Sequence, residues 1–183
     1  MSNLIQSRFN NPLLSDIEEY SKKTYSLTLT EEEIQTLKAY TQSRYSLINS
    51  NLRNSIIPKE SIIIDTCLSK FNYDKKLKVY RKLYIKDLWT NPYAKKAFIN
   101  ILRDGYIIDK AYQSTSLNIV SFRSPFNVLL QLEVNGNQGA YISPFSHYSE
   151  EEEFLIKRDS RIDIKSYKVE ENYGIITVEG KIR

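Results

Sequence analysis

The chain has 183 residues, of which 41% are hydrophobic and 26% charged, proportions typical of one globular domain with its own core. The formal net charge is only +4 and no long Lys/Arg block concentrates it, so the composition does not indicate a nucleic-acid-binding protein. One cysteine and one histidine exclude an intrachain disulfide and leave no zinc-ligand pattern. No apolar run is long enough for a membrane span, and the N-terminus lacks the apolar core of a signal peptide.

The first part of the chain carries the signals of helices. Ser15-Asp16-Ile17-Glu18 and Thr30-Glu31-Glu32-Glu33 both match the capping box, in which a hydroxyl and a later Glu side chain satisfy free N–H groups. Residues 61–71 form a further predicted helix, and Asn91-Pro92 and Gly105 fit the start and exit of another. After Thr30, one helical stripe is formed by Ile34, Leu37, Tyr45, Ile48 and Leu52.

Strands are predicted for most of the remainder. Apolar and polar residues alternate along 77–83 and along 126–132, as in strands with one buried face. Asn135-Gly136 marks a turn, and residues 162–167 and 173–178 form a predicted closing pair. Because helices come first and strands later, the order indicates an α+β fold and not a doubly wound sheet.

Residues 151–156, Glu-Glu-Glu-Phe-Leu-Ile, are predicted to form one strand that carries carboxylates. Because a strand alternates its faces, Glu151 and Glu153 would share one side, while Glu152 would join Phe154 on the other. Two carboxylates side by side on a rigid element can stabilise a cation and accept a proton. The alternative is a solvated acidic run, which is the commoner location of a charge block.

Two other positions carry candidate chemistry. Arg81 lies on the predicted face of its strand that is otherwise apolar, where a guanidinium needs an anion or several acceptors. It could form a strand-end ion pair, or bind a ligand phosphate or a buried carboxylate such as Glu153. In Ser114-Thr115-Ser116 the two serines would face one way on a strand and could orient a carboxylate or a ribose, although such triplets are common in loops.

An arginine on one strand, a Ser-Thr-Ser on a second and a Glu-x-Glu on a third, in that order along the chain, resemble the Arg–Ser–Glu class of mono-ADP-ribosyltransferases. The surroundings are similar too: residues 79–82 resemble the arginine strand of that family, and residues 139–143 the strand before its substrate-recognition loop. Tyr148 stands three residues before Glu151, where arginine-modifying members carry an aromatic. Upstream, the segment with Tyr40-Thr41, Tyr45 and Ile48-Asn49 resembles the helix that closes over NAD in clostridial and bacillar binary toxins, which modify actin.

The resemblance implies a role for each matching residue. Arg81 would hold the NAD phosphates, and Ser114 would support the catalytic carboxylate. Glu153 would bond the ribose 2′-hydroxyl and stabilise the oxocarbenium cation, whereas Glu151, with Tyr148 nearby, would engage the acceptor guanidinium. The other implied NAD contacts are Tyr40, Tyr45, Asn49, Lys82, Thr115 and Ser116, with Phe122 and Arg123 in the following loop, where Phe126 competes with Phe122.

The implied architecture is the ADP-ribosyltransferase fold in one domain. Residues 1–57 would form a helical region that caps NAD, and residues 58–183 a β-rich core of two packed, mainly antiparallel sheets. NAD is the implied substrate, and no metal is required.

The implied reaction is transfer of ADP-ribose to an arginine of a target protein, because Glu-x-Glu replaces the Gln-x-Glu of asparagine-modifying members. We expect a monomeric toxin domain that is secreted or delivered into a target cell, with host actin as the favoured acceptor. Three alternatives stay open: a phage-encoded or interbacterial enzyme that modifies a bacterial protein, a NAD glycohydrolase, and a catalytically silent binding module.

Overall fold

The computed structural model describes residues 12–120 and 125–183, and these contain five α-helices and eight strands. The helices are α2 (Pro12–Lys23), α3 (Glu31–Ala39), α4 (Tyr45–Arg53), α5 (Lys59–Lys70) and α6 (Pro92–Arg103). A π-helical segment, Tyr40–Arg44, joins α3 directly to α4. The strands are β1 (Lys76–Leu83), β2 (Tyr106–Asp109), β3 (Gln113–Ser116), β4 (Val128–Asn135), β5 (Gly139–Tyr141), β6 (Glu153–Ile156), β7 (Ser160–Glu170) and β8 (Ile175–Ile182).

Most of the predicted helix boundaries are confirmed. Thr30 caps α3 with a complete capping box, in which its hydroxyl accepts the Glu33 N–H and the Glu33 carboxylate accepts the Thr30 N–H. The Asn91 side chain accepts hydrogen bonds from two N–H groups in the first turn of α6. Gly105 follows the end of that helix and has a φ of +81°. The capping box predicted at Ser15 is wrong, because Ser15 lies inside α2.

The strands form one mixed sheet, in the order β2-β7-β8-β4-β1-β3-β6-β5. Neighbouring strands are antiparallel except β4 and β8, which are parallel. β1 pairs with β4 along its whole length and meets β3 at the register pair Tyr80 and Ser116. The α+β prediction is confirmed. The two predicted sheets are joined into one, because β1 pairs with β4 on one side and with β3 on the other.

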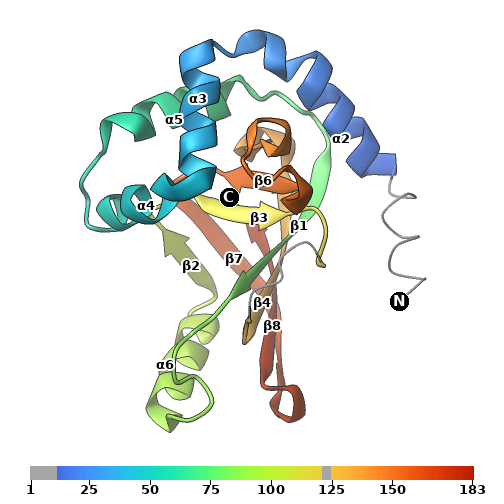
Figure 1. Cartoon of the computed structure of the whole chain (residues 1–183). Helices are drawn as coiled ribbons and strands as arrows, with labels where there is room; N and C mark the ends of the chain where they lie inside the picture. The colour runs from blue at the N-terminus through green and yellow to red at the C-terminus, as the bar shows by residue number, and fades with distance from the viewer. Residues whose placement is uncertain (1–11, 121–124) are drawn as a thin grey trace.

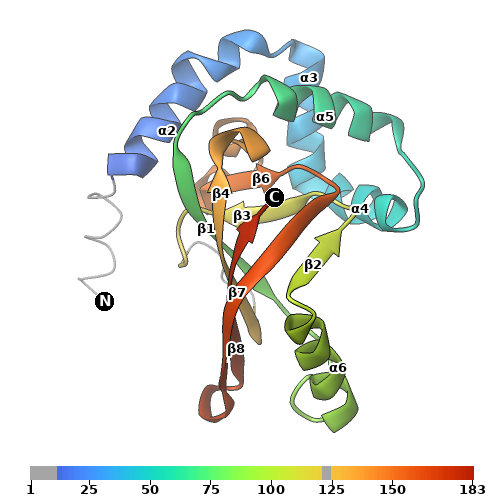
Figure 2. The same ribbon diagram turned by 180° about the vertical axis from the view of Figure 1, so that it is seen from behind.

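The helices are divided between the two ends of this sheet. Figure 1 shows α2, α3, α4 and α5 arching over β3 and β6, whereas α6 lies at the opposite end, and Figure 2 shows the same division from behind. The sheet twists so far along its length that β3 and β6 run across the direction of β4, β7 and β8.

An aromatic cluster connects the helical layer to β6. Phe71, which follows α5, is 1% exposed, and its ring contacts Tyr25 edge-on with centroids 4.9 Å apart. The Phe71 ring also lies 6.2 Å from that of Phe154 on β6. On α5, Ile64 and Leu68 are buried as well, so the helix predicted over residues 61–71 turns an apolar face inward. The helices are thus packed directly against the strand that begins at Glu153.

The strand predicted over 151–156 is two residues too long. β6 starts at Glu153, whereas Glu151 ends a 3₁₀ turn and Glu152 has a φ of +50°, in the left-handed region. Strand alternation therefore does not place Glu151 beside Glu153. The alternative of a solvated acidic run applies to Glu150, which is exposed, but not to Glu152 and Glu153, which are buried.

Neither a membrane span nor a metal cluster is found in the described part of the chain. No helix within residues 12–120 and 125–183 is long and apolar enough to cross a membrane. Within the same ranges, no three His, Cys, Asp or Glu side chains lie close enough together to hold a metal ion.

A substitution at Gly139 tests the close packing of β5 against β6. A Cβ atom at this position would lie 2.3 Å from the Leu155 carbonyl oxygen and 2.6 Å from a ring carbon of Phe154. We therefore expect Gly139→Ala to lower the free energy of unfolding by about 1–3 kcal/mol in urea denaturation. Gly174→Asn is the control, because this turn position has a φ of +62°, which Asn tolerates, and an added Cβ atom would make only an ordinary van der Waals contact, 3.7 Å from the Trp89 ring nitrogen. A wild-type midpoint for Gly139→Ala would contradict the described packing.

Candidate active site

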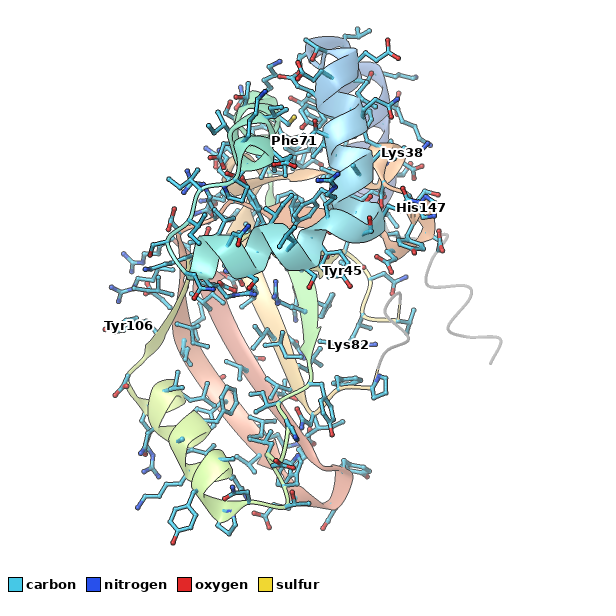
Figure 3. All side chains as sticks on the ribbon, turned by 60° about the vertical axis from the view of Figure 1, so that its left-hand side comes forward. Lys38, Tyr45, Phe71, Lys82, Tyr106 and His147 are labelled. Atoms are coloured by element: carbon cyan, nitrogen blue, oxygen red, sulfur yellow. The ribbon has the colours of Figure 1, made fainter. Side chains whose placement is uncertain are left out.

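A cavity of about 300 Å³ lies between the corner formed by α3 and α4 and the face of β1. Figure 3 shows Tyr45 at this corner, Lys82 on β1 below it, and His147 beside it. The lining residues are Tyr40, Thr41, Tyr45, Asn49, Arg81, Lys82, Leu83, Tyr112, Ser114, Tyr148, Glu151 and Glu153. Its walls therefore come from the helices, from three neighbouring strands and from the loop before β6.

The π-helical segment explains how the helices present three polar side chains to one cavity. Tyr40, Tyr45 and Asn49 are spaced by five and then by four residues. In a regular α-helix only Tyr45 and Asn49 would share a face. The Tyr45 N–H bonds instead to the Tyr40 carbonyl, the five-residue bond of a π turn, so Tyr40 is brought to the same side. At the mouth of the cavity Tyr45 is 52% exposed, so its place in the predicted apolar stripe is wrong.

Tyr40 is fixed by contacts on two sides. Its hydroxyl accepts a hydrogen bond from the Asn49 side-chain amide at 3.1 Å, and its ring packs edge-on against Tyr112, with centroids 5.7 Å apart. Tyr112 is held in turn by Asp65 on α5, whose carboxylate accepts its hydroxyl at 2.6 Å. Burial raises the pKa of Tyr40 above its ordinary value, so the phenol stays neutral at physiological pH.

Arg81, Ser114 and Glu153 meet at the inner wall of the cavity because β1, β3 and β6 are neighbours. Ser116 pairs with Tyr80 on one side and with Glu153 on the other, which sets the three strands in register. The Arg81 Nη1 donates to the Ser114 carbonyl at 3.4 Å, and the Ser114 side chain hydrogen-bonds the Glu153 carboxylate. The three sequence motifs are thus brought together at one place.

Arg81 also lies near the Asp109 carboxylate, which already forms an ion pair with Arg53. The Asp109 carboxylate at the end of β2 is bound by the Arg53 guanidinium through two hydrogen bonds, of 3.0 and 2.9 Å. Burial lowers the pKa of Arg81 from its ordinary value, and the negative charge of Asp109 opposes that shift. A guanidinium in such a position favours an anionic ligand that offers it more acceptors.

Glu153 carries a buried carboxyl group with a raised pKa. The residue is 4% exposed, and burial raises the pKa of its carboxyl to about 7. The Ser114 hydrogen bond and the Arg81 charge lower this pKa, whereas the negative charge of Glu151 raises it. Two hydrogen bonds also fix the Glu153 backbone. The Glu153 N–H donates to the Ser143 hydroxyl, and the Glu153 carbonyl accepts the Ile142 N–H at 3.0 Å.

Glu151 and Tyr148 reach the cavity from the segment 143–151, which we call the 143–151 loop. The Glu151 N–H donates to the Tyr148 carbonyl at 3.1 Å, so a tight turn links the two residues. Glu151 is half-buried, and burial, with a smaller effect of Glu150, raises the pKa of its carboxyl. Both side chains therefore face the same cavity as Glu153, although they come from a turn and not from a strand.

The remaining predicted site residues differ in their placement. Lys82 lines the cavity, and its ammonium lies 4.9 Å from the centroid of the Phe126 ring. Thr115 and Ser116 are buried beside the cavity but do not line it: the Thr115 hydroxyl donates to the Phe154 carbonyl, and the Ser116 hydroxyl accepts the Asn118 N–H. Phe122 and Arg123 lie outside the described residues.

Three lining residues were not predicted from the sequence: Thr41, Leu83 and Tyr112. The positions of Leu83 and Tyr112 could have been found, since Leu83 stands two residues after Arg81 on β1 and Tyr112 two residues before Ser114, next to the start of β3. Thr41 belongs to the segment that resembles the helix closing over NAD, but no role was assigned to it, because the π turn that directs it inward leaves no mark in the hydrophobic periodicity.

Residues 17–182 match the family model of the ADP-ribosyltransferase exoenzymes. This match covers nearly the whole sequence, and the chain belongs to that family.

Solved structures of known toxins share the fold of this chain. The ADP-ribosyltransferase toxin Plx2a from Paenibacillus larvae superposes with a TM-score of 0.76 at 24% identity, over 93% of this chain and 96% of that chain. BECa, an ADP-ribosylating toxin of a C. perfringens binary enterotoxin, was solved with NADH. It gives a TM-score of 0.76 at 20% identity, and the superposition covers 96% of this chain and 49% of that chain. The predicted ADP-ribosyltransferase fold is confirmed.

A sequence relative is the NAD(+)–arginine ADP-ribosyltransferase EFV of Enterococcus faecalis, 28% identical over 161 residues. The match covers 82% of this chain and 32% of the relative, so the chain spans about a third of the length of that protein.

The buried Glu153 carboxyl predicts a pH-dependent cost in stability. Its folded pKa of about 7 lies above the ordinary value of 4.5, so between these values the folded state holds a proton that the unfolded chain has released. Stability should fall as pH rises through this window. In thermal melts, we expect Glu153→Gln to gain melting temperature relative to wild type at about pH 8 compared with about pH 5. The exposed Glu150→Gln is the control, and equal differences at the two pH values for Glu153→Gln would contradict the assignment.

Proposed function

We propose that this protein cleaves NAD and transfers the ADP-ribose to an arginine side chain of a target protein. The observation that carries the proposal is the buried Glu153 carboxyl, with Arg81 and Ser114 beside it and Glu151 facing the same cavity. A cavity of about 300 Å³ is within the size range of small-molecule sites. Membership of the ADP-ribosyltransferase exoenzyme family supports the reaction class.

The first step breaks the bond between the nicotinamide nitrogen and C1′ of the adjacent ribose. Nicotinamide leaves with the bonding electron pair, and an oxocarbenium-like cation remains on the ribose. The ionised Glu153 carboxylate stabilises this charge, which develops only in the transition state. Its hydrogen bond from Ser114 and the nearby Arg81 charge both favour the ionised form. The site therefore offsets part of the burial penalty that would otherwise keep Glu153 protonated.

Arg81 and the helical corner supply the NAD-binding groups. The planar guanidinium of Arg81 can bind a phosphate through two parallel hydrogen bonds. Tyr45 at the mouth, Asn49 one turn further along α4, and Lys82 next to Arg81 line the same cavity and can contact the rest of the dinucleotide. In this proposal residues 1–57 cap NAD, while the strands hold the reacting bond.

The second step forms the bond between C1′ and a guanidinium nitrogen of the acceptor. Glu151 can bind a guanidinium through both carboxylate oxygens and accept the proton that the attacking nitrogen releases. The raised pKa of Glu151 makes it a stronger base than an ordinary glutamate. The name of the Enterococcus faecalis relative, an arginine ADP-ribosyltransferase, supports arginine as the acceptor.

The acceptor to test first is actin, with the protein acting as a monomeric toxin inside a target cell. The support is the sequence resemblance to actin-modifying binary toxins and the shared fold with a binary enterotoxin component. The experiment is incubation with labelled NAD and either purified actin, host lysate or bacterial lysate, followed by identification of the labelled arginine. Label on a bacterial protein alone would replace the toxin proposal by an interbacterial or phage role.

Glu151 separates transfer from hydrolysis. Water needs no guanidinium clamp, so we expect Glu151→Gln to keep most NAD hydrolysis while transfer to arginine falls by about 10²-fold or more. Glu153→Gln is the comparison variant and should lose both activities, since both need the cation to be stabilised. Nicotinamide release and protein labelling are measured on the same sample. If the two activities of Glu151→Gln fell together to background, Glu151 would belong to the NAD-cleaving groups.

A further inference from the structure

One buried hydroxyl joins the π-helical segment to the 143–151 loop. The Thr41 hydroxyl donates to the Lys38 carbonyl at 3.0 Å and accepts the His147 N–H, also at 3.0 Å. Thr41 is 7% exposed and lines the cavity. Figure 3 shows Lys38 on α3 above the corner and His147 close beside it, which are the two points that this hydroxyl connects.

The direction of these two bonds fixes the loop. The Thr41 hydroxyl donates its proton to the Lys38 carbonyl. A lone pair of the same oxygen therefore points toward the loop and accepts the His147 N–H. His147 precedes Tyr148, and the Tyr148 carbonyl accepts the Glu151 N–H at 3.1 Å. A displacement of His147 would therefore move both side chains that the loop contributes to the cavity.

The NAD-cleaving groups are anchored independently of this contact. The Glu153 backbone is held by Ser143 and Ile142, and its carboxylate is held by Ser114. Tyr40 is held by Asn49 and Tyr112. Loss of the Thr41 hydroxyl would thus release residues 146–151 of the loop, while Ser143 and the wall around Glu153 stay in place.

From this geometry, and building on the proposed function, we infer that Thr41 is a positioning residue for the acceptor. Its hydroxyl holds the 143–151 loop against the π-helical segment and so determines how much ADP-ribose goes to a guanidinium and how much to water. The same segment carries Tyr40 and leads into Tyr45, so the acceptor wall and the nucleotide wall are set by one turn of helix.

The test compares three variants with agmatine as the guanidinium acceptor. Thr41→Val removes the hydroxyl and keeps the side-chain shape, whereas Thr41→Ser keeps the hydroxyl. Thr36→Val is the matched control, because the Thr36 hydroxyl donates to the Glu32 carbonyl of the same helix, whereas the Thr41 hydroxyl is bonded to His147 of the loop. We expect Thr41→Val to lower the ratio of transfer to hydrolysis at least about tenfold, through a higher KM for agmatine. Thr41→Ser should restore transfer, and Thr36→Val should change neither activity.

Hydrogen exchange tests the positioning without any acceptor. Amides of residues 146–151 should exchange faster in Thr41→Val than in wild type or Thr36→Val. Unchanged exchange would overturn the inference, as would faster exchange with an unchanged ratio of transfer to hydrolysis. If the wild type released nicotinamide but modified no guanidinium, the proposed arginine acceptor would be wrong, and the hydrogen-exchange result would then decide whether Thr41 holds the loop.

Discussion

A carboxyl group that is almost out of reach of solvent stands at the first residue of β6, and the rest of the site is arranged around it. Burial makes ionisation of Glu153 costly, and the Ser114 hydrogen bond and the Arg81 charge reduce that cost. These partners are available only because β1, β3 and β6 are adjacent in the sheet. The Phe154 ring next to Glu153 packs against Phe71, so the helical layer fixes the strand that carries the carboxylate.

The second constraint is the π turn between α3 and α4. One five-residue turn brings Tyr40 to the face that already carries Tyr45 and Asn49, and places Thr41 against the 143–151 loop. π turns are rare and are frequent at functional sites, which fits this position. The contact at Thr41 means that the helix lining the cavity and the loop that carries Glu151 are not independent. A nucleotide that bound against Tyr45 would therefore bind to an element that already holds the acceptor wall.

Much of the fold and most of the site could be read from the sequence, for reasons that particular residues make clear. Capping at Thr30 and Asn91 is local chemistry, and the pattern along 77–83 is strict alternation, so both were predictable. Strand order and the continuous sheet depend on long-range pairing, which periodicity does not record. The π turn is local, but one five-residue bond between Tyr40 and Tyr45 leaves no distinct pattern in the sequence. Glu151 is the instructive case: it does face the Glu153 cavity, but through a 3₁₀ turn and a left-handed Glu152, not through the strand geometry first assigned to it.

The measurement that tests this account most directly is the pH dependence of kcat/KM for nicotinamide release, which reports the ionisation of the free enzyme. The account requires the ionised form of Glu153, whose pKa is about 7. It predicts that kcat/KM rises about tenfold for each pH unit below that value and levels off above it. A profile that is flat from about pH 5.5 to about pH 8.5, or that rises toward acid, would contradict the central role of the Glu153 carboxylate.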